Sequence, residues 1–267
     1  MIFRTTAVVL ALLAVPALAR SDRGRVVQKA LRESVRIEVL VHGKVERAAS
    51  GVVIGREGDT SYVLTNQHVV QREGLSGGAS FQVVVERPRL HRVPARIVHE
   101  GKVPDEDLAI LAVEGEALAV APVASEDQVD VGDDVVVVGA PYGRALSVSA
   151  GIVSQLEVDE QEPRIQRSMK TDAPIGYGAS GGGVFAVPSG RLVGIVEGYR
   201  TAKVAFGGIS KDDFSFDVPM PGETFLSPPG KIRSFLVRSG LGRLAGIKGS
   251  ALMPAAPSAA APLARER

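Results

Sequence analysis

The sequence predicts an all-β fold of antiparallel strands, and three observations support this class. Short runs of β-branched and apolar residues recur along most of the chain, separated by turn residues. The composition includes 30 glycines but only 8 phenylalanines and no tryptophan, which fits short strands joined by tight turns. No series of helices alternates with these runs, which argues against a doubly wound parallel sheet. An antiparallel barrel and a sandwich both fit the pattern.

A short helix over residues 22–34 is expected to precede the strands, because four apolar residues recur at helical spacing: Val26, Val27, Ala30 and Leu31. Eleven strands are then expected at 35–41, 51–54, 62–65, 81–86, 95–98, 108–113, 134–138, 147–153, 184–187, 191–196 and 204–209.

One C-terminal helix is expected after Ser227, which would cap it ahead of two prolines. Gly240 supplies the stop signal. Three apolar residues then share one helix face, available for packing on the β body: Ile232, Phe235 and Leu236.

The two ends of the chain are expected to lie outside this fold. Residues 1–19 have a basic start, an apolar run at 7–15 and an A-x-A cleavage pattern at 17–19, typical of a secretory signal peptide. An uncleaved leader acting as a membrane tether is the alternative. Residues 249–267 are rich in Ala and Pro and are expected to be disordered. We therefore expect one folded unit over 22–248, exported to the periplasm or secreted, with a bacterial source and no stable membrane insertion after cleavage.

Composition narrows the possible ligands and partners. The 31 basic and 30 acidic residues nearly cancel, so nucleic acid is not an expected partner. The absence of cysteine excludes disulfides, thiolate zinc sites and cysteine nucleophiles. The acidic run 157–162 is interpreted as a mobile surface loop rather than a metal site. No metal or cofactor is therefore expected, and the sequence carries no signal for an oligomeric state.

The glycine-rich segment 178–183 contains a candidate nucleophile, Ser180. Small neighbours leave a serine hydroxyl accessible and leave backbone N–H groups free to bind a carbonyl oxygen. The order of possible partners separates the known triads. The α/β-hydrolase order needs a histidine after the serine, but all four histidines precede Ser180: His42, His68, His91 and His99. The subtilisin order is poorly supported, because the only aspartates before His68 are Asp22 and Asp59. The order histidine, aspartate, serine remains.

Two segments supply candidate partners for Ser180. His68 lies just past the end of an expected strand, in a polar turn. Asp107 stands directly before an apolar strand, where a carboxylate can meet an imidazole at a barrel end. Asp105 competes with it on spacing alone.

Three motifs resemble, in order and spacing, those of the trypsin-like serine proteases of the HtrA/Deg type: T-N-Q-H-V-V at 65–70, D-L-A-I-L at 107–111 and G-A-S-G-G at 178–182. Segments 51–54, 131–143, 149–154 and 170–173 are similar to further stretches of that family. The resemblance covers about residues 50–200.

This resemblance implies a fold and a set of roles. The fold would be a double six-stranded antiparallel β-barrel with the active site between the barrels and the C-terminal helix at its end. Ser180 would be the nucleophile, His68 the general base and then acid, and Asp107, in preference to Asp105, the orienting carboxylate. The backbone N–H groups of Gly178 and Ser180 would form the oxyanion hole.

Three departures from the family pattern stand out. Gly183 replaces the usual proline and is expected to loosen the backbone after the nucleophile. Ala179 replaces an aspartate or asparagine, which argues against activation by an inserted N-terminus. Fewer than 30 residues follow Gly240, so no PDZ domain is expected after the helix.

The substrate pocket is expected to be lined by two groups of residues: Ile175, Gly176 and Tyr177, then Val196, Glu197 and Gly198. Glu197 would favour a basic substrate residue if it faced the pocket. The absence of other charges favours a small or medium apolar residue before the scissile bond.

We therefore predict an exported serine endopeptidase that cleaves polypeptides through a His-Asp-Ser triad and an acyl-enzyme. The alternatives are a catalytically silent protease-like module that binds peptides or proteins, and an esterase with the same triad. The intact set of His68, Asp107 and Ser180 argues against the silent module.

Overall fold

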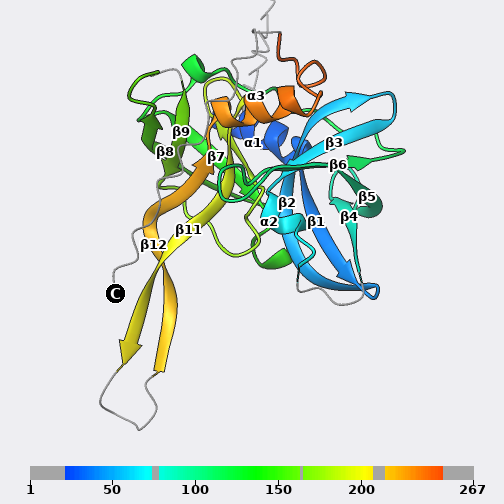
Figure 1. Ribbon diagram of the computed structural model, residues 1–267, viewed down its shortest axis with the longest axis horizontal. Helices are drawn as coiled ribbons and strands as arrows, with labels where there is room; N and C mark the ends of the chain where they lie inside the picture. The colour runs from blue at the N-terminus through cyan, green and yellow to red at the C-terminus, as the bar shows by residue number, and fades with distance from the viewer. Residues whose placement is uncertain (1–21, 74–77, 163–164, 207–213, 249–267) are drawn as a thin grey trace, which may run out of the picture.

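Two closed barrels of six antiparallel strands make up the fold (Figure 1). The computed structural model describes residues 22–73, 78–162, 165–206 and 214–248. The predicted all-β class is confirmed, as are the double six-stranded barrel and its C-terminal helix. The expected leader 1–19 and tail 249–267 lie outside the described residues.

The first barrel closes around an apolar interior. In order around the barrel its strands are β1 (Ser34–Val41), β2 (Lys44–Glu57), β3 (Thr60–Thr65), β6 (Ala109–Val113), β5 (His91–Glu100) and β4 (Ala79–Val85). Strand β6 is buried along its whole length because the side chains of its two faces pack into two different apolar cores. Ala109, Leu111 and Val113 point into the barrel, whereas Ile110 packs between the barrels.

The second barrel has the same closed arrangement. In order around it the strands are β7 (Asp134–Gly139), β8 (Ser147–Val158), β9 (Gln166–Thr171), β12 (Phe214–Ser227), β11 (Leu192–Phe206) and β10 (Gly183–Ala186). Strands β11 and β12 continue past their neighbours as a two-stranded arm, which projects from the body in Figure 1.

The second barrel also holds the main differences from the sequence prediction. Strands β9 and β12 were not expected, and the runs 191–196 and 204–209 belong to one strand, β11, as far as residue 206. Residues 207–209 lie outside the described part. Strand β9 is mostly polar, and β12 contains Pro219 and Pro221, which are unusual inside a sheet. Neither strand therefore shows the β-branched run on which the prediction depended.

A third apolar core joins the barrels, and the two long helices cover it. Helices α1 (Asp22–Glu33) and α3 (Pro229–Arg238) pack on this core. The expected face of α3 is buried: Ile232, Phe235 and Leu236. The predicted cap was wrong, because Ser227 is the last residue of β12 and Pro228 occupies the N-cap position. The remaining helical segments are short: α2 (Gln67–Val70), η1 (Glu126–Gln128) and η2 (Pro141–Gly143).

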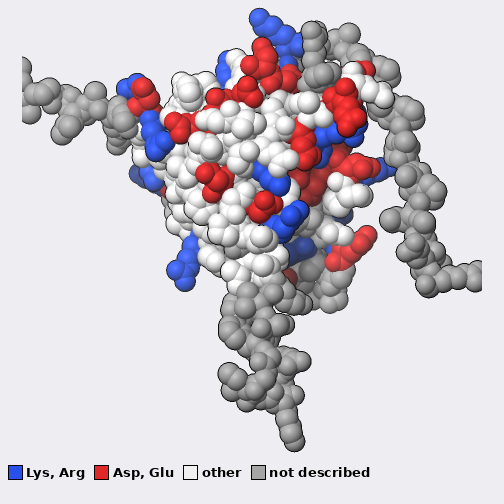
Figure 2. Space-filling model, turned by 90° about the vertical axis from the view of Figure 1, so that its left-hand side faces the viewer, with Lys and Arg blue, Asp and Glu red and all other residues white. Residues whose placement is uncertain are grey.

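The surface carries charges of both signs. On the face shown in Figure 2, acidic and basic side chains are interspersed with uncharged ones rather than gathered into one field. Among the helices of the described ranges, none is long and apolar enough to cross a membrane.

Candidate active site

His68 and Asp107 meet at one end of the first barrel. His68 lies in α2, directly after β3, and Asp107 lies two residues before β6, which pairs with β3. His68 Nδ1 is 2.6 Å from Asp107 Oδ2, and the backbone N–H of His68 donates to Oδ1 at 2.9 Å. An ionised carboxylate only accepts hydrogen bonds, so it favours the tautomer with its proton on Nδ1. The lone pair of Nε2 is then available to act as a base.

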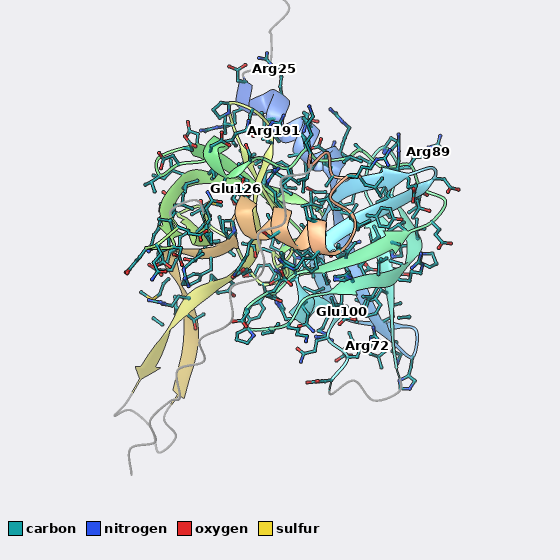
Figure 3. All side chains as sticks on the ribbon, turned by 45° about the horizontal axis from the view of Figure 1, so that its top comes forward. Arg25, Arg72, Arg89, Glu100, Glu126 and Arg191 are labelled. Carbon is teal, nitrogen blue, oxygen red and sulfur yellow. The ribbon has the colours of Figure 1, made fainter. Side chains whose placement is uncertain are left out.

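The backbone around this pair is held by neighbouring side chains of the same barrel. Asn66 Nδ2 donates to the carbonyl oxygen of Asp107 at 2.9 Å. Arg47 Nη1 donates to the carbonyl oxygen of His68 at 3.3 Å. Just beyond α2, Arg72 forms an ion pair with Glu100 of β5 at 3.1 Å; both residues are labelled in Figure 3.

Asp105, the alternative partner, is exposed on the preceding turn. In the part of the chain that the structure describes, the carboxylate bonded to His68 belongs to Asp107. The two aspartates are separated in space because Asp107 leads directly into the buried strand β6, whereas Asp105 lies in a surface turn.

Ser180 lies in the tight loop that leads into β10. Gly178 and Gly181 flank it with φ angles of +86° and +79°, a conformation that favours glycine. Neither position has room for a side chain. A Cβ atom would lie 2.7 Å from the Ala140 carbonyl oxygen at Gly178, and 2.1 Å from the Ser50 carbonyl oxygen at Gly181.

Hydrogen bonds fix the carbonyl groups on both sides of Ser180. The carbonyl oxygen of Tyr177 accepts from the N–H of Tyr142. The carbonyl oxygen of Ala179 accepts from the N–H of Gly182 at 2.8 Å. The other two carbonyls of the loop, those of Gly178 and Ser180, both accept from Ser50 of β2, at 2.7 and 2.9 Å.

Two N–H groups of this loop remain free. The N–H groups of Ala179, Gly181 and Gly182 donate to backbone carbonyls. Those of Gly178 and Ser180 have no acceptor within the described ranges. Gly178 and Ser180 are half-buried, and their N–H groups are available to donate to an oxygen atom of a bound molecule.

Across the described residues, Ser180 and His68 share no hydrogen bond. Catalytic hydrogen bonds are often long or absent in a ligand-free enzyme and tighten only in the complex with substrate. The two residues come from different barrels, so their separation depends on how the barrels pack.

Gly183 and Ala179, two of the departures from the family motif, are well packed. Gly183 is the first residue of β10 and pairs with Ile195 of β11. A Cβ at Gly183 would lie 2.6 Å from the Phe185 ring and 2.7 Å from Val52, so this position has no room for a side chain. The expected loosening of the backbone stays a prediction. Ala179 is 3% exposed and belongs to the core of the second barrel.

A cavity of about 320 Å³ opens beside Ser180. Its lining contains no charged side chain and consists of Ile175, Gly176, Tyr177, Gly178, Ser180, Gly198, Tyr199 and Thr201. The rings of Tyr177 and Tyr199 meet edge to face with centroids 6.0 Å apart. Burial, and then the nearby phenols of Tyr177 and Tyr142, raise the pKa of Tyr199, so its hydroxyl stays neutral.

Two of the residues expected to line the pocket lie outside this lining. Val196 is fully buried in the core of the second barrel. Glu197 accepts a hydrogen bond from Ser227 Oγ at 2.5 Å and lies 3.7 Å from Lys231 Nζ. Its carboxylate is therefore paired with the last residue of β12 and with Lys231 in α3, so it adds no charge to the cavity lining.

Sequence reasoning missed Ser50, Tyr142 and Thr201. Ser50 is 128 positions away from Gly178, so no local pattern connects them. Tyr142 lies in η2 with a φ of +58°, a conformation rare for a tyrosine and not foreshadowed by its neighbours. Thr201 lies in the part of β11 that was not expected to be a strand.

The comparison with known families agrees with this geometry. The model described as the trypsin-like peptidase domain matches residues 49–195, more than half of the chain. The chain belongs to this family. The resemblance to trypsin-like proteases of the HtrA/Deg type is thereby confirmed, and it extends to several relatives.

A probable periplasmic serine endoprotease, DegP-like, of Ectopseudomonas mendocina is 32% identical over 203 residues. That match covers 74% of this chain and 38% of the relative. The serine endoprotease DegS of Haemophilus influenzae is 34% identical over 154 residues, which cover 57% of this chain and 42% of the relative. The chain thus spans well under half the length of these relatives.

Solved structures share the fold of this trypsin-like peptidase. A serine endoprotease from Yersinia pestis superposes with a TM-score of 0.61 at 23% identity, over 84% of this chain and 68% of the other. The HtrA-type protease AlgW with a tripeptide gives a TM-score of 0.62 at 23% identity, over 84% and 64%.

Proposed function

We propose that this chain is an exported serine endopeptidase that cleaves polypeptides through Ser180, His68 and Asp107. The observation that carries the proposal is the pair of free N–H groups at Gly178 and Ser180, held beside an uncharged cavity. The hydrogen bond between His68 and Asp107 and the membership of the trypsin-like peptidase family support it.

In the first step, Ser180 Oγ attacks the carbonyl carbon of the scissile bond while His68 Nε2 accepts the hydroxyl proton. Asp107 keeps the imidazole in the required tautomer and stabilises the imidazolium. The tetrahedral oxygen takes up negative charge between the N–H groups of Gly178 and Ser180. Loss of one such donor costs about 3–4 kcal/mol of transition-state stabilisation in related enzymes.

In the next steps, the C–N bond breaks as His68 gives its proton to the leaving amine, which leaves an ester on Ser180 Oγ. Water then attacks this ester and loses a proton to His68. The C–O bond breaks as His68 returns the proton to Ser180 Oγ, which releases the acid product and restores the enzyme.

The pocket favours an uncharged residue before the scissile bond. Its lining combines the rings of Tyr177 and Tyr199 with small residues, and its volume of about 320 Å³ accepts a small or medium apolar side chain. The paired state of Glu197 removes the feature that would favour a basic residue.

Export is part of the same proposal. The leader-like segment 1–19 supports it, and relatives carry the description periplasmic serine endoprotease. The expected partners are polypeptide substrates.

The test is to treat the mature protein with a fluorophosphonate and map the adduct by mass spectrometry, with Ser180→Ala as control. The proposal predicts an adduct on Ser180 and casein cleavage by the wild type alone. Labelling without cleavage of any peptide substrate would favour an esterase. Absence of labelling near neutral pH would favour a protein that binds peptides without cleaving them.

A further inference from the structure

Ser50 is a buried serine of the first barrel that contacts the nucleophile loop of the second. It lies in β2, is 1% exposed and has all of its polar groups in use. Its N–H donates to the Ser180 carbonyl at 2.9 Å, and its carbonyl oxygen accepts from Thr65 Oγ1 at 2.8 Å. Buried polar groups are normally hydrogen-bonded, and the bonds of Ser50 connect the two barrels.

The proton of the Ser50 hydroxyl has a defined direction. Ser50 Oγ lies 2.8 Å from the backbone nitrogen of Ala140 and 2.7 Å from the carbonyl oxygen of Gly178. The Ala140 N–H can only donate and the Gly178 carbonyl can only accept. Ser50 therefore accepts from Ala140 and donates to Gly178, and no other proton is available at Oγ.

The bonds of Ser50 hold the peptide planes that directly follow the two residues with free N–H groups. An N–H group lies in the same plane as the carbonyl of the preceding residue, and the plane that follows its residue limits rotation about that residue's Cα atom. At Gly178, the plane before is held by Tyr142, and the plane after is held by the Ser50 hydroxyl. At Ser180, the plane before is held by Gly182, and the plane after is held by the Ser50 N–H.

We propose that Ser50 is a positioning residue for the oxyanion site, which restrains the backbone of Gly178 and Ser180 from the opposite barrel and so limits the movement of their N–H groups. The inference rests on the proposed function. Ser50 touches no reacting atom, and it acts only through the carbonyl groups that it holds. Because His68 and Asp107 belong to the same barrel as Ser50, it also keeps the oxyanion donors in a fixed relation to the base.

The experiment compares Ser50→Ala with the wild type on a peptide substrate. Glycine at 178 tolerates several backbone conformations, so loss of the hydroxyl frees the plane after it. Deletion of an oxyanion donor costs about 100- to 1000-fold in kcat. Ser50 acts through the backbone and does not itself donate to the oxyanion. We therefore expect a smaller loss of about 10- to 100-fold in kcat, with KM changed less than about twofold.

Two inhibitors separate positioning from general weakening of the fold. A peptide boronic acid forms a tetrahedral adduct with Ser180 and places an oxygen against the free N–H groups. The matching peptide acid, a product, binds the same pocket without that adduct. For Ser50→Ala, affinity for the boronic acid should fall by the factor seen in kcat/KM, whereas affinity for the product should stay within about twofold.

Thr65→Val is the matched control. It removes a buried hydroxyl that bonds to Ser50 and that, among the described residues, forms no hydrogen bond with Gly178 or Ser180. We expect it to lower the melting temperature about as much as Ser50→Ala while kcat stays within about threefold of the wild type. Ser50→Thr keeps the hydroxyl and should recover most of kcat, which also covers the case in which Ser50→Ala folds poorly.

Three results would overturn the proposal: unchanged kcat in Ser50→Ala, an equal loss of kcat in Thr65→Val, or equal losses of affinity for the boronic acid and the product. If the wild type cleaved peptides and one of these results followed, the role of Ser50 would be rejected while the proposed function would stand. If the wild type neither reacted with a fluorophosphonate nor cleaved peptides, the proposed function would fall with it.

Discussion

The hydrogen bonds that hold His68 and Asp107 are all made with residues of the first barrel, to which both belong. The loop around Ser180, in contrast, accepts two hydrogen bonds from a residue of the other barrel. Asn66 and Arg47 support the first pair locally. Ser50 reaches across to the second site. The proposed base is thus positioned by its own barrel, and the proposed oxyanion site depends on how the two barrels pack.

A second contact between the barrels supports this comparison. Arg36 of β1 is 9% exposed, and its guanidinium donates to the carbonyl oxygen of Gly143 at 2.5 Å. Gly143 directly follows Tyr142, whose N–H holds the Tyr177 carbonyl. Both planes around Gly178 are therefore connected to the first barrel, one directly and one through η2.

Among the variants that compare the two barrels, the largest effect is expected from breaking the pair of His68 and Asp107 inside the first barrel. Asp107→Asn should lower kcat by about 10⁴-fold, because an amide can donate to Nδ1 and so favours the wrong imidazole tautomer. Steady-state hydrolysis of a peptide substrate measures this loss. Asp105→Asn is the matched control and should keep kcat within about twofold. A similar loss in both variants would contradict the assignment of Asp107.

The contact between the barrels can be strained at Gly181. Gly181→Ala would place a Cβ 2.1 Å from the Ser50 carbonyl oxygen, in addition to the cost of a positive φ. Gly43→Ala has a similar φ of +75° and no atom within 4 Å, so it reports that cost alone, about 1–2 kcal/mol. We expect Gly181→Ala to lose roughly 1–3 kcal/mol more than Gly43→Ala in urea unfolding. Equal losses would show that the contact is not tight.

Much of this account could be predicted from the sequence, because local patterns carry it. Each strand run, the face of α3 and each of the three motifs around His68, Asp107 and Ser180 spans only a few neighbouring residues. The contacts of Ser50 were beyond reach because they join residues 128 and 130 positions apart, and a serine in a strand has no pattern that marks it as a donor. Strand β9 was missed because closure of the barrel, rather than its own polar sequence, makes it a strand.

The smallest effects concern pH and two buried carboxylates. Burial raises the pKa of Glu33 from its ordinary value of 4.5, against the opposing hydrogen bond from Lys29. Burial also opposes the charge on Glu38, but hydrogen bonds from Arg92 and Gln82 outweigh it and hold the pKa of Glu38 below 4.5. The contribution of Glu33 to the free energy of unfolding therefore becomes more favourable as pH falls toward 4.5. The contribution of Glu38 is complete above 4.5 and is lost as pH falls below it.

The variants Glu33→Gln and Glu38→Gln measure separately the two pH ranges in which these carboxylates change the stability. The unfolding free energy of the wild type relative to Glu33→Gln should rise on acidification toward pH 4.5. Relative to Glu38→Gln it should fall below pH 4.5. Chemical denaturation at a series of pH values measures both differences, and a rise in place of the fall for Glu38→Gln would contradict its pairing with Arg92 and Gln82.

The most direct measurement of the central claim is the rate of peptide hydrolysis by the wild type and by Ser180→Ala, with the acyl-enzyme trapped by acid quench and mapped by mass spectrometry. The account predicts an acyl group on Ser180 and a loss of about 10⁶-fold in kcat in the variant, with unchanged folding. Hydrolysis that persists in Ser180→Ala, or an acyl group on any other residue, would contradict it.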